Sequence, residues 1–204
     1  MVSVAVRFQE FGDEKQLDGE YLVCCLPLAI LKKIPVTPAW PESKRFVLDN
    51  VAFGSQSRVL LQSRTPFWKG DLPSINLETA DDVPGDRSIL MGSGRPDVTP
   101  DEALTAFKGF YPGKSHTLEQ AYVHNWSKAP WAFSCERHPF GLGKLKQFWP
   151  HITLPVGRIH FAGSFADNLP WGMDAATRSA NRTAETIDRL RLEGDSLRPS
   201  AGTR

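Results

Sequence analysis

Cysteine is scarce in this chain, whose 204 residues include only Cys24, Cys25 and Cys135. No two of them have the C-x-x-C spacing of zinc ligands, and no histidine pair is spaced to complete such a set. We therefore predict no metal site and no disulfide framework. The default expectation for a chain of this kind is the cytosol.

Net charge and long apolar runs are lacking as well. The formal net charge is +1 and the isoelectric point is about 7.8. Such a balance argues against a nucleic-acid footprint and against a polybasic membrane-binding surface. No run approaches the ~18 apolar residues of a membrane-spanning helix, and the N-terminus has no apolar core of a secretory signal. We therefore expect no nucleic-acid partner and no membrane span.

A dinucleotide-binding fingerprint is also missing. The pattern G-x-G-x-x-G should follow a strand and open a helix, so that backbone N–H groups surround a pyrophosphate. The G-x-G runs at residues 92–94 and 141–143 do not have that context. The sequence therefore offers no segment to hold the phosphate end of a dinucleotide.

The most strongly patterned stretch covers residues 157–190. Residues 158–162 are mostly apolar and end at Gly163, which is typical of a buried parallel strand. Polar residues and a proline then predict a loop, and a helix is expected from about Gly172. The residues alone leave open that this is an ordinary strand–loop–helix packing unit.

One apolar stripe follows the expected helix. Its residues recur at intervals of three and four: Met173, Ala176, Ala180, Ala184, Ile187 and Leu190. Small side chains let such a helix lie close against a sheet or a flat ligand. The free N–H groups and the positive dipole end of the first turn favour an electron-rich ligand edge.

The rest of the chain predicts a mixture of strands and helices. Strands are expected at residues 2–8, 20–27, 57–62, 89–91 and 122–126 and near Ile75, loops elsewhere in 70–97, and helices at 30–34, 43–51 and 99–110. A capping box from Thr99 to Glu102 opens the last of these helices. Cys24 and Cys25 are expected in the core, and residues 193–204 are expected to fray.

The patterned stretch resembles the C-terminal flavin signature of the flavin-containing amine oxidase family, which includes monoamine, polyamine and L-amino-acid oxidases. The matching runs are R-I-H-F-A-G at residues 158–163 and W-G-M-D-A-A at residues 171–176. The resemblance implies flavin contacts from these runs, namely from Gly163, Ser164, Trp171, Gly172 and Met173. Two positions depart from the family, since Ser164 replaces an acidic residue or threonine and Ala175 replaces a glycine.

Two further places carry the resemblance. The strand at residues 57–62 places Arg58 where the family has a lysine that holds a water at flavin N5. Arginine can donate to such a water but cannot act as a base, and a surface arginine on a strand edge is the alternative.

The second place is the run W-S-K-A-P-W-A-F-S-C-E at residues 126–136. It implies that Trp126 packs against the flavin and that Trp131, Cys135 and Glu136 line the substrate cavity. Cys135 falls where covalently flavinylated members carry their cysteine. Because most relatives hold FAD without a covalent bond, an unlinked Cys135 and noncovalent FAD are expected.

The resemblance covers residues 2–190 and implies the C-terminal half of such an enzyme. We expect an α/β fold, α+β in its substrate part: residues 1–38 and 141–191 in a partial FAD-binding domain, residues 39–140 in a sheet-containing substrate domain, and a flexible tail at 192–204. The implied activity is oxidative deamination of an amine or amino acid, giving an imine and hydrogen peroxide. The alternatives are an inactive fragment or a subunit that needs an N-terminal FAD-binding half, and a related flavin desaturase. The expected protein partner is such a separate half or a further copy of this chain.

Overall fold

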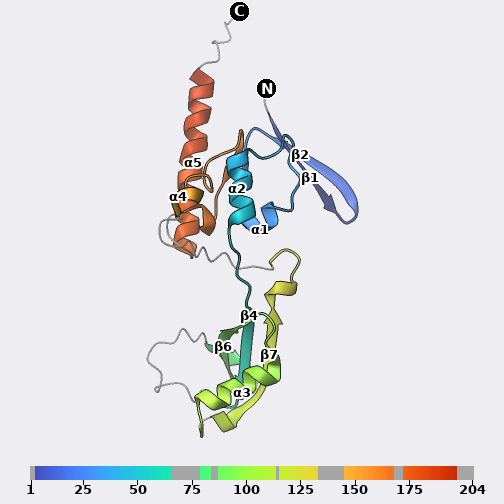
Figure 1. Cartoon of the computed structure of the whole chain (residues 1–204), viewed down its shortest axis with the longest axis vertical. Coiled ribbons are helices and arrows are strands. Elements are labelled where there is room, and N and C mark those ends of the chain that lie inside the picture. Colours follow the sequence, from blue (N-terminus) through green and yellow to red (C-terminus); the bar gives the residue numbers. More distant parts are fainter. Residues whose placement is uncertain are drawn as a thin grey trace, which may run out of the picture. The chain divides into compact units, whose positions relative to one another are not determined.

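The computed structural model describes residues 3–65, 79–83, 87–113, 115–132, 145–167 and 172–196. These residues form mixed helices and sheets, as expected for an α/β protein (Figure 1). The chain divides into two compact units, residues 1–53 with 136–204 (unit 1) and residues 54–135 (unit 2). The expected division into a flavin-binding and a substrate part stays a prediction, and each unit is described below by itself.

Unit 1 begins with an antiparallel hairpin, whose first strand overlaps the strand predicted at residues 2–8. Strands β1 (Val4–Glu10) and β2 (Asp13–Gly19) pair antiparallel, and we call them the ribbon. Because Val6 lies opposite Leu17 and Phe8 lies opposite Lys15, the alternating apolar residues of β1 share one face of the ribbon. Among the described strands, β1 and β2 hydrogen-bond only to each other.

Strand β3 (Leu22–Cys24) pairs in parallel with β8 (Ile159–Phe161), which lies far away in the sequence. Short helices α1 (Leu28–Leu31) and α4 (Leu145–Phe148) and the longer α2 (Glu42–Asn50) surround this pair. The expectation that both cysteines are buried is wrong for Cys25, which is exposed. Cys25 follows the last paired residue of β3, so its side chain points opposite to that of Cys24.

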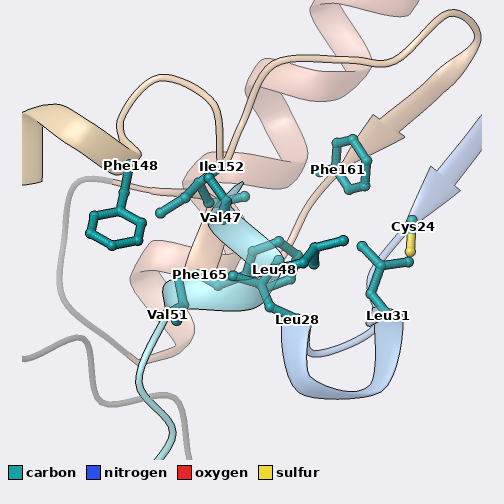
Figure 2. Close-up of a cluster of buried hydrophobic side chains, with 11 residues drawn as sticks. Cys24, Leu28, Leu31, Val47, Leu48, Val51, Phe148, Ile152, Phe161 and Phe165 are labelled. Carbon is teal, nitrogen blue, oxygen red and sulfur yellow. The ribbon is translucent and has the colours of Figure 1, made fainter. Parts of the chain in front are cut away.

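The core of unit 1 is assembled from six different elements and loops (Figure 2). Its buried residues are Cys24, Leu28, Leu31, Val47, Leu48, Val51, Phe148, Ile152, Phe161, Phe165 and Ala166. They come from both ends of the sequence, so this core forms only when residues 22–51 and 148–166 meet. Burying such apolar side chains contributes about 1.5–3 kcal/mol each for the larger ones.

A lysine lies inside this apolar core. Lys44 is only 2% exposed, its Nζ donates to the Ile152 carbonyl at 3.0 Å, and the same atom lies 3.8 Å from the centroid of the Phe161 ring. Burial lowers the pKa of Lys44 to about 8. Lys44 thus ties α2 to β8, but with a charge that the interior disfavours.

Unit 2 is a four-stranded antiparallel sheet in the order β5-β6-β4-β7. The strands are β4 (Ser57–Ser63), β5 (Thr79–Val83), β6 (Arg87–Gly94) and β7 (Leu118–Asn125). Helix α3 (Pro100–Phe110) covers one face and begins with the predicted capping box. The core between them contains Val59, Leu61, Leu90, Ala103 and Leu118. Because side chains alternate along each strand, the other face of the sheet is not covered by α3.

The sheet corrects two expectations. Residues 79–83 form the edge strand β5, although Asp81 and Asp82 suggested a loop. Strand β5 pairs with β6 at Thr79, Ala80 and Val83, and the register shifts at the two aspartates between them. Strand β6 also extends to Gly94, so the first G-x-G run lies within a paired strand and not in a phosphate-binding turn.

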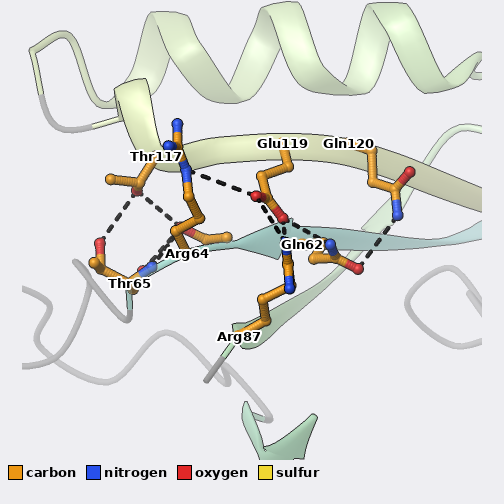
Figure 3. Close-up of polar contacts among 8 residues, drawn as sticks. Gln62, Arg64, Thr65, Arg87, Thr117, Glu119 and Gln120 are labelled. Carbon is orange, nitrogen blue, oxygen red and sulfur yellow. Dashed lines mark hydrogen bonds and ion pairs between the residues drawn. The ribbon is translucent and has the colours of Figure 1, made fainter. Parts of the chain in front are cut away.

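A polar network ties three strands together at one end of this sheet (Figure 3). Glu119 accepts from Arg87 Nε and from Gln62 Nε2, each at 2.7 Å, and lies 3.6 Å from Arg64 Nε. The hydrogen bond from Arg87 and then that from Gln62 lower the pKa of Glu119. The network lies where the β4–β7 register shifts, between Gln62 and Ser63, so it fixes the pairing beside the bulge.

Among the described residues, no helix is both long enough and apolar enough to cross a bilayer.

We expect the substitution Lys44→Met to remove a pH dependence of stability. The folded pKa of about 8 lies below the ordinary value of 10.5, so between these values the unfolded state binds more protons and Lys44 makes the fold more stable as the pH rises. From pH ~7 to pH ~10.5, the unfolding free energy of the original chain should rise by on the order of 3 kcal/mol relative to Lys44→Met. Urea denaturation followed by tryptophan fluorescence measures this difference.

The control is Lys32→Met, which removes an exposed lysine and its surface ion pair with Asp49 at 3.0 Å. Its difference from the original chain should stay small throughout. A Lys44→Met difference that is equally independent of pH would contradict the buried, disfavoured cation.

Candidate functional site

The turn after β8 connects the strand to the long C-terminal helix, and its geometry requires glycine. Gly163 has φ +143°, and a Cβ built there would lie 2.7 Å from Cε1 of Phe165. The turn continues into a single 3-10 turn, Ser164–Ala166. Phe165 is buried in the core of unit 1, so its ring cannot move aside without opening that core. Packing against Phe165 therefore requires a glycine at position 163.

A serine hydroxyl fastens this turn to helix α5 (Met173–Ser196). The Gly163 N–H donates to Ser179 Oγ at 2.8 Å, and the Ser179 hydroxyl lies within donating distance of the carbonyls of Gly163 (2.9 Å) and Ala176 (2.8 Å). Ser179 is fully buried. One turn further along, Thr183 Oγ1 donates to the Phe161 carbonyl at 3.0 Å. We call the contacts of Ser179 and Thr183 with residues 161–163 the clasp.

An ion-pair cluster holds the next part of the loop. The carboxylate of Asp167 is fully buried, Arg182 Nη1 donates to it at 2.9 Å, and Arg178 Nε lies 3.5 Å from it. Arg182 Nη2 also donates to the Ala166 carbonyl. Because both arginines come from α5, the cluster fixes the helix against the turn from a second side.

The face of α5 that packs on β8 is not the predicted apolar stripe. The buried residues are Ala175, Ser179 and Thr183, whereas Ala180 and Ala184 of the stripe are exposed. Periodicity identified a helix correctly, but the hydrogen bonds of the clasp decide its rotation. The helix also runs to Ser196, so part of the predicted fraying tail is helical.

The N-terminus of α5 is open. Gly172 has φ +96° with nothing within 4 Å of a built Cβ, and Met173 is 87% exposed. The first helical hydrogen bond runs from the Ala176 N–H to the Gly172 carbonyl at 3.3 Å, and no described residue accepts a hydrogen bond from the Met173 or Asp174 N–H. Ala175, which replaces the family's glycine, is completely buried and its methyl group fits. Free donors at an exposed, positive helix end fit the electron-rich edge of an isoalloxazine ring.

In unit 2, Arg58 lies on the uncovered face of the sheet. Its strand β4 is an interior strand, so the edge position given in the alternative is wrong, whereas a surface arginine without a role in the chemistry stays an alternative. Arg58 lies opposite Ser93 on one side and His124 on the other, and these three side chains share that face. Arg58 is exposed, and no described residue accepts a hydrogen bond from its guanidinium.

The two predicted tryptophans of unit 2 follow β7. Trp126 begins the 3-10 turn Trp126–Lys128, which Asn125 caps by accepting from the Ser127 N–H at 2.9 Å. The indole of Trp126 is 42% exposed and meets the His124 ring edge-on at a centroid distance of 4.3 Å. Trp131 is 73% exposed. Both indoles are available for contact with another molecule.

The predicted site residues therefore fall into three groups. Gly163, Ser164, Gly172 and Met173 belong to one strand–turn–helix of unit 1, and Arg58, Trp126 and Trp131 belong to unit 2. Trp171, Cys135 and Glu136 lie outside the described residues.

Sequence reasoning missed the residues that hold the turn, above all Ser179 and Asp167. Asp167 was interpreted only as a polar loop residue, and Ser179 lies on a helix that was interpreted from its apolar spacing. The sequence signal for Ser179 was its spacing, since Ala175, Ser179 and Thr183 recur every four residues and share one face of the helix.

Comparisons with known proteins identify a family for this chain. The family described as flavin containing amine oxidoreductase matches residues 3–188. Amine oxidase [flavin-containing] B of Cavia porcellus is 24% identical over 196 residues, and the match covers 83% of this chain and 38% of that protein. The protein of the same name from Sus scrofa is 25% identical over 195 residues, with the same coverage. The chain thus spans 38% of the length of these relatives.

Solved structures show a similar fold. Cyclohexylamine oxidase from Brevibacterium oxydans superimposes with a TM-score of 0.72 at 19% identity, over 89% of this chain and 45% of that one. Putrescine oxidase bound to putrescine superimposes with a TM-score of 0.70 at 19% identity, over 85% and 44%.

We expect Gly163→Ala to destabilise unit 1 more than Gly172→Ala. Both glycines have positive φ, which costs an alanine about 1–2 kcal/mol, but only at position 163 does the new Cβ collide with a core ring. Overpacking adds roughly 1–3 kcal/mol there. Urea denaturation of the two variants measures the difference, and equal losses would contradict the steric reason given for Gly163.

Proposed function

Because this chain belongs to the flavin-containing amine oxidoreductase family, we propose that it forms the C-terminal part of an FAD-dependent amine oxidase. The substrate would be an amine or an amino acid, which is oxidatively deaminated to an imine with release of hydrogen peroxide. The observation that carries the proposal is the open N-terminus of α5, held in a fixed orientation to β8 by the clasp.

Five residues of unit 1 would hold the flavin end of FAD. The backbone of Gly172 and Met173 would donate to the pyrimidine edge of the ring, and Gly163, Ser164 and Trp171 would lie beside it. Trp126 of unit 2 would pack against the ring. When bound, FAD supplies the two-electron oxidation of the amine, and the protein contributes position and electrostatics. We propose noncovalent binding, with Cys135 unlinked.

Arg58 would hold a water at the reacting edge of the flavin. Its exposed guanidinium can donate two or more hydrogen bonds, so it would orient and polarise the water as a donor and not as a base. Trp131, Cys135 and Glu136 would line the cavity that receives the amine. His124 is paired with Arg58 across strands β4 and β7, so its ring would lie on the same side of the sheet as the bound water.

The second candidate function is an inactive fragment or a subunit that needs an N-terminal FAD-binding half. What favours it is the size of the match, which covers 38% of the curated relatives. In addition, no described helix of this chain begins with a glycine-rich phosphate-binding turn, because the described G-x-G run lies within β6. The residues that bind the isoalloxazine ring of FAD would then lie on this chain, and those that bind its pyrophosphate would lie on the N-terminal half.

We therefore expect the 204-residue chain alone to bind FAD only weakly and to release no peroxide from amines. It provides donors for one end of FAD, and the pyrophosphate and ribose are left without partners. The test is a fluorescence-quenching titration of the purified chain with FAD, together with a peroxide assay over a panel of amines and amino acids.

Adding an N-terminal segment with the G-x-G-x-x-G pattern should restore both the yellow colour and the activity. Submicromolar FAD binding with turnover by this chain alone would overturn the half-enzyme proposal. Failure of every such N-terminal segment to restore FAD binding would favour the inactive fragment.

In a flavin-loaded complex, we expect Arg58→Met to slow flavin reduction or reoxidation roughly tenfold, the rate equivalent of one lost hydrogen bond of about 1.4 kcal/mol. Arg58→Lys should retain most of the rate, because an ammonium group can also hold the water. Stopped-flow absorbance measures both half-reactions. Arg58→Met traces identical to those of the original protein would show that Arg58 has no part in the chemistry.

A further inference from the structure

Oxidation of an amine requires that its nitrogen first lose a proton. An alkylamine is protonated at neutral pH, because its pKa is close to the ~10.4 of a lysine side chain. The ammonium nitrogen has no lone pair to assist the removal of two electrons from the α-carbon, so the proton must leave before that step. Arg58, which would lie at the reacting edge, cannot accept it. A base must therefore lie within reach of the amine nitrogen.

His124 places an imidazole beside Arg58 on the uncovered face of the unit 2 sheet. The two residues are Cα partners in the antiparallel β4–β7 pair, so their Cβ atoms lie about 4.5–5.5 Å apart on one face. His124 is exposed, and no described residue hydrogen-bonds to its ring nitrogens. An imidazole nitrogen is thus available within the span of one water molecule from the guanidinium of Arg58.

The other polar groups on this face are poorer proton acceptors. By alternation along the paired strands, the described side chains of the face are Arg58, Leu60 and Gln62 of β4, Ile89, Met91 and Ser93 of β6, and Gln120, Tyr122 and His124 of β7. Serine, glutamine and tyrosine side chains do not accept a proton at neutral pH.

The carboxylate of Glu119 is engaged elsewhere. It accepts hydrogen bonds from Arg87 and Gln62, which lower its pKa. It also lies five residues before His124 on β7, which is about 17 Å along a strand. Among the described residues of this face, His124 is therefore the group that can take the proton of an amine bound beside Arg58.

Two neighbours act on a proton held by His124. The indole of Trp126 meets the His124 ring edge-on at a centroid distance of 4.3 Å, and an electron-rich indole attracts a cation. Arg58 is the charged group that faces His124 from β4, and it repels a second cation. Tyr122 lies on the same side of β7, and Lys128 is the charged residue of the turn that carries Trp126. The opposing effects of the indole and the guanidinium suit a group that takes a proton and releases it again.

We propose that His124 accepts the proton of the substrate ammonium before the amine is oxidised. One N–H bond of the ammonium breaks and its electron pair stays on nitrogen. The proton binds an imidazole nitrogen, directly or through the water held by Arg58, and then passes to solvent. No electron leaves the substrate in this step. The inference rests on the proposed function and adds to it a catalytic residue on this chain.

The test compares His124→Gln with the original protein in the FAD-loaded complex on two substrates. The first is the primary amine or amino acid of the panel that is oxidised fastest. The second is its β,β-difluorinated analogue, whose nitrogen is largely neutral at pH ~8 because fluorine withdraws electrons. At this pH, His124→Gln should lower kcat/KM for the first substrate at least tenfold and for the analogue less than about twofold. Raising the pH to ~10 should narrow the first loss, since the substrate then loses its proton to water.

A second measurement does not depend on turnover. The analogue in which methyl groups replace the α-hydrogens of the substrate cannot be oxidised. The chain has five histidines, whose imidazole Cε1 atoms are labelled with ¹³C before the complex is formed. Adding this analogue at pH ~8 should move one imidazole resonance, absent from the spectrum of His124→Gln, toward the imidazolium position. A resonance that stays in place contradicts proton transfer to His124.

The matched control is His116→Gln, which removes another exposed histidine of unit 2 from the 3-10 turn Ser115–Thr117. It should leave kcat/KM unchanged for both substrates. A second variant, His124→Thr, carries a β-branched side chain suited to a strand and should reproduce the difference between the two substrates. Circular dichroism and the melting temperature of each variant check that the fold is kept.

The outcomes separate this inference from the proposed function. An equal loss on both substrates, or no loss on either, overturns the role of His124 while the proposed function stands. Glu136, which lies outside the described residues, is the competing acceptor: a difference between the substrates with Glu136→Gln and none with His124→Gln also overturns it. If no FAD-loaded form of the protein oxidises any amine or amino acid, the proposed function fails and the role of His124 with it.

Discussion

The buried hydroxyl of Ser179 is the contact on which the rest of unit 1 depends. It receives the Gly163 N–H at 2.8 Å and lies within donating distance of two carbonyls, so it satisfies polar backbone groups of the turn after β8. Thr183 repeats the arrangement one turn later on the Phe161 carbonyl. These bonds fix both the distance and the rotation of α5 relative to β8.

That rotation decides which residues of α5 face the core of unit 1. Ser179 and Thr183 are buried against the turn after β8, whereas Ala180 and Ala184 are exposed. At the start of the helix, no described residue accepts a hydrogen bond from the Met173 or Asp174 N–H, as is usual for a first helical turn.

Unit 2 obtains its candidate residues from strand register. Alternation along β4 sends Val59 and Leu61 to the core under α3 and Arg58 to the opposite face. Antiparallel pairing then brings His124 beside Arg58, and the turn after β7 adds Trp126. A cation, an imidazole and an indole thus share a surface, although the sequence separates Arg58 from the other two by more than sixty residues.

Local patterns in the sequence determined much of this protein: the hairpin, α2, the capped start of α3, strand β4 and the strand–turn–helix with its flavin signature all follow from periodicity, capping and glycine position. Tertiary structure decided what depends on distant partners. Strand β5 exists because β6 pairs with it, Cys25 is exposed because pairing with β8 ends at Cys24, and α5 turns Ser179 inward because the Gly163 amide needs an acceptor. Apolar spacing can predict that a helix has a face to bury, but a buried backbone donor elsewhere in the chain decides which face the protein itself uses.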